Sequence, residues 1–296
     1  MKRARPPAHH PKAIGSTTKI AAVFGDPVEH SLSPAMHNAA YAALGMDRIY
    51  VACQVKTERL AAAIRSIAAL GLIGVNLTTP HKQLALRVVK NLSDEARVLG
   101  AANCIVNRGG ELYGDNTDAR GLERAIRELG LRIAGRDVMV IGAGGAAAAT
   151  VLALQRLKAR RIVIANRTPA RAHALARRLP AHDGSIFEAR GLDALNDRSL
   201  LASAALILNA TPMGLVTSRF VGLDYGATSP NCIFQDLIYA PEPTPFLAPA
   251  LAVGRRTFDG TAMLLHQGLL AFRLFNGVAA PAEAMRDALL ERLGHC

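Results

Sequence analysis

Three observations predict an α/β protein of two domains. Short apolar segments alternate along the chain with longer helical segments. One apolar segment, at 138–141, runs directly into a glycine-rich turn and an alanine-rich helix. The chain has 296 residues, a length typical of two domains. Because strand–helix–strand units connect parallel strands, the alternation favours a mostly parallel sheet in each domain.

The composition excludes several classes of protein. Hydrophobic residues make up 50% of the chain and charged residues 20%, so a substantial core can be buried. No apolar run reaches the roughly 18–20 residues that a membrane span needs, and the first strongly apolar segment, 20–24, is too short for a signal peptide. The four cysteines have neither zinc-site nor disulfide-framework spacing. We therefore expect a cytoplasmic protein with free thiols, no bound metal and no membrane segment.

The formal net charge of +12 raises nucleic acid as a partner. The positive residues are spread along the chain, however, with few aromatic residues among them and no helix-turn-helix or zinc-finger spacing. Most are arginines in an alanine-rich sequence, which indicates compositional bias. An electropositive surface also suits anionic substrates and cofactors, so we expect no nucleic-acid partner.

The first predicted domain covers 19–118, after a basic, proline-containing tail at 1–18 that we expect to be disordered. The expected helices begin at Ser33 as N-cap with Pro34 in the first helical position, at Thr57 as a cap, and after Lys82, ending near residues 45, 70 and 89. The expected strands are 20–24, 49–55, 71–77 and a strand following the turn at 100–103.

The second predicted domain covers 119–259, and a helix at about 119–129 leads into it. Its expected strands are 137–141, 161–166, 206–209, 232–239 and 256–258. Its expected helices are 145–158, 168–179 and 244–253, and two further helices, at 261–275 and 281–293, finish the chain.

The glycine-rich turn after 138–141 has the pattern G-x-G-x-x-A, typical of dinucleotide sites. Gly142 permits the tight turn, Gly144 lets a pyrophosphate approach the backbone, and Ala147 lets helix and strand pack closely. The helix N-terminus adds free N–H groups and partial positive charge. The alternative is a glycine-rich turn inside an apolar core. The predicted phosphate contacts are Gly142, Ala143, Gly144, Gly145 and Ala146.

The next strand predicts which dinucleotide binds. An NAD enzyme usually has Asp or Glu where this chain has Asn166, Arg167 and Thr168. Arg171 follows Arg167 by four residues, and two guanidiniums one helical turn apart can hold a 2′-phosphate. The alternative is two solvated arginines in an arginine-rich protein. The pattern favours NADP(H).

Polar residues also follow the strands of the first domain, where open α/β sheets bind ligands. Ser31 and Ser33, beside a helix N-terminus, suit a carboxylate, although capping alone would also explain Ser33. Lys82 is a candidate base for oxidising a secondary alcohol, and Asp118 a candidate to orient it. Taken alone, each of these two is more often a surface charge.

Together these motifs resemble the shikimate dehydrogenase family. The motifs occur in the family's order between residue 20 and about residue 280. They are SLSP at 31–34, NLTTPHK at 76–82, GAAN at 100–103, NTD at 116–118, GAGGAA at 142–147, NRT at 166–168, NATPMG at 209–214, DLIY at 236–239 and MLLHQG at 263–268.

The resemblance implies NADPH-dependent reduction of 3-dehydroshikimate to shikimate, a step of chorismate and aromatic amino-acid biosynthesis. It implies a Rossmann-type NADP domain, a substrate domain that 260–296 rejoins, and an active site in the cleft between them. It makes Lys82 and Asp118 a catalytic pair that also contacts the substrate. The other implied substrate contacts are Ser31 and Ser33 for the carboxylate, and Asn76, Thr78, Asn103, Tyr239 and Gln267 for the hydroxyls and frame. The implied cofactor contacts beyond the glycine-rich turn are Asn166, Arg167, Thr168, Arg171, Thr211, Met213, Gly260 and Met263.

Two alternatives stay open. A quinate/shikimate dehydrogenase of relaxed specificity would carry nearly the same motifs, although those that use NAD tend to have an acid where this chain has Asn166 and Arg167. A non-catalytic NADP-binding regulator could share the fold, but the presence of both Lys82 and Asp118 argues against it. The sequence leaves monomer and homodimer equally open.

Overall fold

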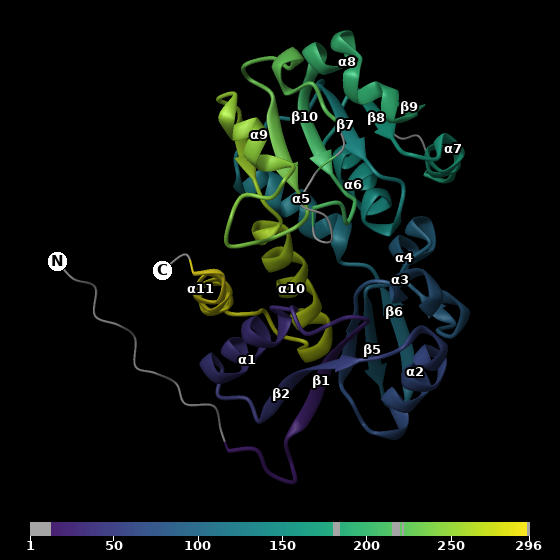
Figure 1. Cartoon of the computed structure of the whole chain (residues 1–296). Helices are drawn as coiled ribbons and strands as arrows, with labels where there is room; N and C mark the ends of the chain where they lie inside the picture. The colour runs from purple at the N-terminus through teal and green to yellow at the C-terminus, as the bar shows by residue number, and fades with distance from the viewer. Residues whose placement is uncertain (1–12, 180–183, 215–219, 221, 295–296) are drawn as a thin grey trace, which may run out of the picture. The chain divides into compact units, whose positions relative to one another are not determined.

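The structure, a computed structural model, describes residues 13–179, 184–214, 220 and 222–294 and separates into two compact units (Figure 1). Unit 1 comprises Met1–Ser93, Ala101–Asp115 and Gly268–Cys296, and unit 2 comprises Asp94–Gly100 and Asn116–Gln267. Each unit is built on one six-stranded sheet. The predicted two-domain α/β class is confirmed. Most of the predicted basic tail, 1–12, lies outside the described residues.

The sheet of unit 1 has the order β2-β1-β3-β5-β6-β4. Its strands are β1 Lys19–Gly25, β2 Arg48–Gln54, β3 Gly74–Leu77, β4 Asn91–Leu92, β5 Cys104–Arg108 and β6 Glu111–Asp115. β1 is parallel to β2 and β3, whereas β5 is antiparallel to both of its neighbours. A tight turn at Gly109 and Gly110, both with positive φ, joins β5 to β6. Because β5 is reversed, the residue before it, Asn103, lies at the carboxyl end of β3, where its carbonyl accepts a hydrogen bond from Leu77 N at 2.8 Å.

Apolar side chains on β1 and β3 pack against a helix on one face of this sheet. Phe24 and Val75 share a buried cluster with Ile64 and Ile67 of α2 (Leu60–Ala69). The remaining helices that contribute to this unit are α1 Ser33–Ala43, α3 His81–Leu84, α11 Ala282–Leu293 and the last part of α10 Thr261–Asn276. The fold is also held near its start, since the hydroxyls of Thr17 and Thr18 donate to Asp47 at 2.7 and 2.6 Å.

Three predicted helix boundaries in this unit are wrong. The N-cap of α1 is Leu32, whose carbonyl accepts from Met36 N at 3.3 Å, so Ser33 is already helical. Thr57 belongs to a 3₁₀ turn, Thr57–Arg59, that precedes α2. The helix carrying Lys82 ends at Leu84 and continues as another 3₁₀ turn, Ala85–Arg87.

The sheet of unit 2 is parallel throughout, with the order β12-β11-β10-β7-β8-β9. Its strands are β7 Asp137–Ile141, β8 Arg161–Ala165, β9 Ile186–Arg190, β10 Ala204–Asn209, β11 Ile233–Asp236 and β12 Arg256–Phe258. The strand order reverses between β7 and β10. In open parallel sheets this switch point is where ligands bind, outside the carboxyl ends of the strands. The glycine-rich turn and the turn after Asn209 both lie there.

Alternate residues of β7 face two different helical layers. Val138 and Val140 belong to a cluster with α5 Asp118–Glu128, α6 Gly145–Arg156 and α7 Pro169–Arg178. Met139 and Ile141 pack with α8 Arg198–Ser203 and α9 Leu247–Ala252. Burial on both faces explains why these strands are continuous apolar runs. Neither β9 nor α8 was predicted, nor was the short helix α4 Asp94–Leu99, because these polar or short segments have no clear periodicity.

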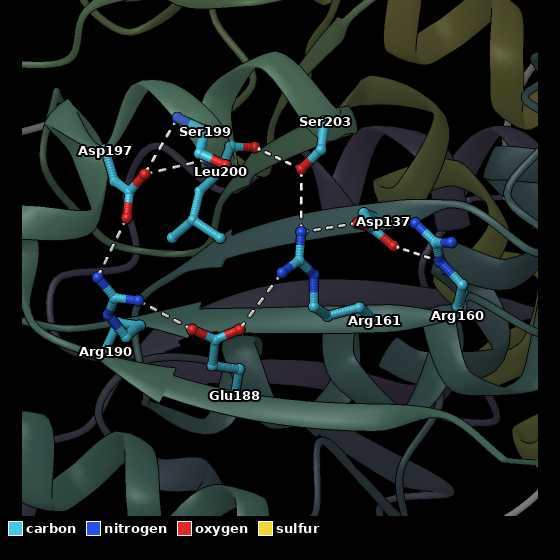
Figure 2. Close-up of polar contacts among 9 residues, drawn as sticks. All are labelled: Asp137, Arg160, Arg161, Glu188, Arg190, Asp197, Ser199, Leu200 and Ser203. Atoms are coloured by element: carbon cyan, nitrogen blue, oxygen red, sulfur yellow. Dashed lines mark hydrogen bonds and ion pairs between the residues drawn. The ribbon is translucent and has the colours of Figure 1, made fainter.

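A network of charged side chains ties the strands of unit 2 together (Figure 2). The Asp137 carboxylate accepts hydrogen bonds from Arg160 Nε at 2.8 Å and Arg161 Nη2 at 2.7 Å, and Arg161 also reaches Ser203 Oγ at 3.0 Å. Burial raises the pKa of Asp137, but the two guanidiniums outweigh it and hold the pKa below its usual range. These contacts lie at the amino ends of β7 and β8, so they join these strands at the edge of the sheet opposite the glycine-rich turn.

A second polar cluster lies at the carboxyl ends of β10 and β11. Asn209 and Asp236 are register partners, and both are fully buried. Asn209 Nδ2 donates to Asp236 Oδ1 at 3.0 Å, Ile238 N donates to the same oxygen at 3.1 Å, and Thr244 Oγ1 donates to Oδ2 at 2.6 Å. Burial raises the pKa of Asp236 to about 6, against the effect of these three donors.

Within the described parts of the chain, every helix is too short or too polar to cross a lipid bilayer. The cysteines described there, Cys53, Cys104 and Cys232, are free thiols. Among the same residues, His, Cys, Asp and Glu side chains form no group of three that could hold a metal ion.

The raised pKa of Asp236 predicts a specific pH dependence of stability. Below pH 3.8 the carboxyl is protonated in both the folded and the unfolded chain. As the pH rises towards 6 the unfolded chain ionises first, so this group costs the folded state about 3 kcal/mol by pH 7. Asp236→Asn is neutral throughout. The unfolding free energy of the wild type minus that of the variant, measured with urea, should fall by roughly 2 kcal/mol between pH 4 and pH 7, because part of the cost is already present at pH 4. A flat difference would contradict the raised pKa.

Candidate active site

A buried hydrogen-bond chain underlies the carboxyl edge of the unit 1 sheet. Asn76 on β3 accepts from Tyr50 Oη on β2 at 2.8 Å and donates through Nδ2 to Asn103 O at 3.1 Å. Tyr50 and Asn103 are almost fully buried and Asn76 is nearly so. The amide of Asn76 is thus oriented from both ends, and it links two strands to the residue that precedes β5. The role of Tyr50 was not predicted; the available signal was a tyrosine in an apolar strand, whose hydroxyl needs a partner when buried.

Tyr50 is itself held firmly. Its ring stacks on the His37 ring, with centroids 4.2 Å apart and an angle of 18° between the planes. The Asn38 side chain exchanges two hydrogen bonds with the Tyr50 backbone, at 2.8 and 2.9 Å, on the outer side of the edge strand. Burial lowers the pKa of His37 to about 3 and raises the pKa of Tyr50 well above its usual value. Both groups are therefore neutral at pH 7, so this stacked pair adds no charge beneath Asn76.

The turn after β3 positions Thr78 and Lys82. Thr78 N donates to Phe24 O at 3.0 Å, and a Cβ placed on Gly25 would lie only 2.4 Å from Thr78 Cγ2, so this approach requires glycine. The Lys82 carbonyl accepts from Ala102 N at 2.8 Å, and the Lys82 side chain is partly exposed. Backbone bonds thus fix the start of α3 on the sheet edge.

The predicted substrate residues of unit 1 lie at the carboxyl edge of its sheet, on β3, in the first turns of α1 and α3, and in the loops next to these elements. Ser31 Oγ accepts from Ser33 N at 3.4 Å, so the Ser31 hydroxyl, rather than that of Ser33, satisfies an N–H group at the start of α1. Ser31 is partly exposed and Ser33 is 8% exposed. The predicted substrate residues at this edge are Ser31, Ser33, Asn76, Thr78, Lys82 and Asn103.

In unit 2 the glycine-rich turn leaves space that a phosphate group fits. Gly142 has φ 119°, and a Cβ on it would lie 3.0 Å from both Ala210 O and Thr211 Cγ2. At Gly144, no described atom lies within 4 Å of where a Cβ would be. Gly144 is the N-cap of α6, and among the described residues no side chain caps this helix. Its N–H groups therefore remain available to an anion, as a dinucleotide pyrophosphate requires.

Two exposed arginines follow β8, one in the loop and one in the first turn of the next helix. Asn166 follows the strand, and its Nδ2 donates to Thr168 O at 2.9 Å. α7 begins at Pro169, so the expectation that Arg167 and Arg171 lie one helical turn apart is wrong. Arg167 precedes the helix and Arg171 lies in its first turn, because proline is favoured as the first helical residue. The two arginines flank a helix N-terminus that has no acidic residue in its first turn.

The turn after β10 lies against the glycine-rich turn. Asn209 Oδ1 accepts from Thr211 N at 3.0 Å and from Thr211 Oγ1 at 2.7 Å, and Thr211 Oγ1 accepts from Met213 N at 3.2 Å. Asn209 Nδ2 also donates to Met213 O at 3.3 Å. The structure thus brings the predicted residue Thr211 beside Gly142 and joins the predicted residue Met213 to Thr211 and Asn209. Asn209 and Asp236 were not predicted as site residues, although a polar residue ending an apolar strand is a signal that could have identified them.

Close backbone approach fixes Gly260 beside the turn that carries Tyr239. A Cβ on Gly260 would lie 2.2 Å from Leu237 O, and Gly260 N donates to Ile238 O at 3.0 Å. Tyr239 is partly exposed. Met263 is 8% exposed and belongs to the apolar core of unit 2.

Asp118 and Gln267 lie on two helices of unit 2 that are in close contact. Asp118 is the first residue of α5, is 3% exposed, and donates its backbone N–H to Asn116 Oδ1 at 3.0 Å. A Cβ on Gly121 would lie 2.8 Å from Gln267 N, so α5 and α10 touch there. Gln267 Nε2 donates to Leu264 O at 2.9 Å.

Family models match three segments of the chain. The model described as "Shikimate dehydrogenase substrate binding domain" matches residues 23–105, "Shikimate / quinate 5-dehydrogenase" matches 123–214, and "Shikimate 5'-dehydrogenase C-terminal domain" matches 260–290. A curated relative, the shikimate dehydrogenase (NADP(+)) of Citrifermentans bemidjiense, is 42% identical over 282 residues, which cover 95% of this chain and 97% of the relative.

Solved structures are similar over nearly the whole chain. Shikimate 5-dehydrogenase from Thermus thermophilus, in complex with NADP(H) and shikimate, is 35% identical with a TM-score of 0.82, covering 93% of this chain and 99% of that one. Quinate dehydrogenase from Corynebacterium glutamicum, in complex with NAD, is 29% identical with a TM-score of 0.83, and the coverage is again 93% and 99%. From the matched segments, the relative and the shared fold, we conclude that the chain belongs to the shikimate dehydrogenase family.

Proposed function

We propose that the protein catalyses the reversible NADPH-dependent reduction of 3-dehydroshikimate to shikimate, in the biosynthesis of chorismate and the aromatic amino acids. The observation that carries the proposal is the N-terminus of α6. It directly follows the glycine-rich turn at the switch point of the unit 2 sheet, and among the described residues no side chain caps it. The loop after the next strand carries the exposed Arg167 where an NAD enzyme has an acid, and Arg171 follows in the first turn of α7, which favours a cofactor with a 2′-phosphate. A curated relative with the printed activity shikimate dehydrogenase (NADP(+)) supports the same assignment.

In this proposal Lys82 and Asp118 are the catalytic pair. When bound, NADPH supplies a hydride to the carbonyl carbon of the substrate. Lys82 gives a proton to the carbonyl oxygen, so that a ketone, a hydride and a proton yield a secondary alcohol, and in the oxidative direction Lys82 removes that proton. Asp118 orients the lysine and the reacting hydroxyl. The turn at Thr78 and the carbonyl contact of Lys82 hold the lysine backbone for this task.

The remaining polar residues recognise the substrate. Ser31 and Ser33, at the N-terminus of α1, would bind its carboxylate. Each substrate hydroxyl would be matched by a polar side chain, and analogues that lack a hydroxyl would be rejected because they leave a buried polar group unpaired. The residues assigned to the hydroxyls and frame are Asn76, Thr78, Asn103, Tyr239 and Gln267.

The cofactor contacts divide into three groups. Gly142 to Ala146 would bind the pyrophosphate. Asn166, Arg167, Thr168 and Arg171 would bind the 2′-phosphate end, with both arginines exposed and able to reach it. The residues assigned to the nicotinamide end are Thr211, Met213, Gly260 and Met263.

The domain roles follow from these assignments. We infer that 19–118, rejoined by 260–296, forms the substrate domain and that 119–259 forms the NADP domain. The compact units of the structure differ from these bounds, because Asp94–Gly100 and residues 116–118 and 260–267 belong to unit 2. The protein would act in the cytoplasm, as either a monomer or a homodimer.

The first prediction from the proposed function concerns specificity. In an absorbance assay at the nicotinamide band, run in the oxidative direction, the wild type should turn over shikimate with NADP⁺, and quinate or NAD⁺ should give far lower kcat/KM. Comparable activity with quinate or NAD⁺ would instead favour the quinate/shikimate dehydrogenase. Cofactor binding without turnover of either substrate would favour the regulator.

The second prediction concerns the 2′-phosphate. Replacing Arg167 and Arg171 together by alanine should raise the KM for NADP⁺ by roughly 10-fold or more, since hydrogen bonds to a charged group are lost, and should leave the KM for NAD⁺ nearly unchanged. Arg177→Ala, an exposed arginine in the last turn of the same helix, is the matched control and should change neither constant. Equal effects of the double variant on both cofactors would remove these arginines as the source of discrimination.

The third prediction concerns proton transfer. Lys82→Met should lower kcat on the order of 100-fold or more, as expected for loss of a general acid–base group, while the Kd of NADPH stays unchanged. Lys90→Ala, an exposed lysine in the same unit, is the control and should keep full activity. Retention of wild-type kcat in Lys82→Met would exclude Lys82 as the proton-transfer group.

A further inference from the structure

We propose that Asn209 and Asp236 are positioning residues for cofactor binding: the hydrogen-bonded pair sets the shape of the Thr211–Met213 turn and so determines affinity for the nicotinamide end of NADPH. The inference rests on the proposed function, because it takes Thr211 and Met213 as cofactor contacts. Neither positioning residue is itself required to touch the cofactor, since both are 0% exposed.

The Asn209 side chain uses its full hydrogen-bonding capacity. Its two Nδ2 hydrogens go to Asp236 Oδ1 and Met213 O, and both lone pairs of Oδ1 accept from Thr211. A rotated amide would place its NH₂ group against the Thr211 N–H and its oxygen against the Asp236 carboxylate. One amide orientation is therefore strongly favoured, and this orientation fixes both ends of the turn.

Asp236 selects that orientation. Its Oδ1 accepts from the Asn209 NH₂ group and from Ile238 N, and its Oδ2 accepts from Thr244 Oγ1. The carboxylate is thus held by three donors, as a buried charge requires. The other titratable groups that act on it are Asp259 and Tyr225, neither of which donates a hydrogen bond to it.

The turn can shift little because of what lies beside it. Ala210 N donates to Ile141 O at 2.9 Å, and Gly142 N donates to Ala165 O at 2.8 Å. The start of the Thr211–Met213 turn and the start of the glycine-rich turn are therefore each hydrogen-bonded to the end of a neighbouring strand. Ala210 O and Thr211 Cγ2 already occupy the space beside the Gly142 Cα. A displaced Thr211 would move into the glycine-rich turn or away from it, and in both cases the surface offered to the cofactor changes.

The test separates the two ends of the cofactor. NADPH binding is followed by its fluorescence without substrate, and binding of adenosine 2′,5′-bisphosphate, which lacks the nicotinamide, is followed by calorimetry. Asn209→Asp puts a carboxylate oxygen in the place of Nδ2, where it faces the oxygens of Asp236 and Met213, so the turn should move. We expect its Kd for NADPH to rise on the order of 10-fold or more, equivalent to losing one or two buried hydrogen bonds, with the Kd for the bisphosphate unchanged.

Two further variants test the roles of Asp236 and Thr244, and a third replaces Asn209→Asp if that variant does not fold. Asp236→Asn keeps an oxygen towards Asn209 and Ile238, and its NH₂ can donate to Thr244 Oγ1, so NADPH affinity should stay within about 3-fold of wild type because neutral hydrogen bonds replace charge-assisted ones. Thr244→Val removes a donor to Asp236 without touching Asn209 and is the matched control, with both affinities expected unchanged. If Asn209→Asp does not fold, Asn209→Leu removes the same hydrogen bonds without adding charge.

The outcomes are distinct. An unchanged NADPH Kd in the folded Asn209 variants would overturn the inference, and so would an equal loss of both ligands, which indicates general damage to unit 2. A wild-type protein that binds neither ligand would overturn the proposed function, and the inference with it. Selective loss of NADPH would support the inference.

Discussion

Parallel pairing of β7 with β8 and β10 is the constraint on which unit 2 depends. It brings the carboxyl ends of these strands to one edge, and the reversal of strand order at β7 and β10 leaves room between the connections that follow them. Because both faces of β7 are covered by helices, its side chains from Val138 to Ile141 supply core packing. The groups that can bind a ligand therefore lie at the strand ends, where backbone N–H groups are exposed.

Polar side chains at buried strand ends must be satisfied inside the protein, and both units meet this requirement in the same way. In unit 2, Asn209 and Asp236 satisfy each other and hold the turns that follow. In unit 1, Tyr50, Asn76 and the Asn103 carbonyl form a comparable chain. An amide that is bonded through both its oxygen and its nitrogen has one preferred orientation, so these chains specify geometry as well as stability.

Charge is distributed differently in the buried chain of unit 1, in the network of Figure 2 and around the N-terminus of α7. The buried chain of unit 1 is neutral, because burial keeps His37 and Tyr50 uncharged. The arginine-rich network of Figure 2 includes the amino ends of β7 and β8, where the negative charge of Asp137 is paired with the positive charges of Arg160 and Arg161. The arginines assigned to the 2′-phosphate are instead exposed beside a helix N-terminus, where a phosphate has both a guanidinium and backbone N–H groups to bind.

The sequence alone determined the local features: the apolar strands of unit 2, the glycine-rich turn with its uncapped helix, and the absence of an acid after β8. These depend on residues that are close together along the chain, so their spacing carries the information. The tertiary structure decided the reversed strand β5, the end of the helix after Lys82, and the partners of Asn76 and Asn209. Tyr50 and Asn76 are 26 residues apart and Asn209 and Asp236 are 27 apart, and each pair meets only when the strands that carry them reach their final register.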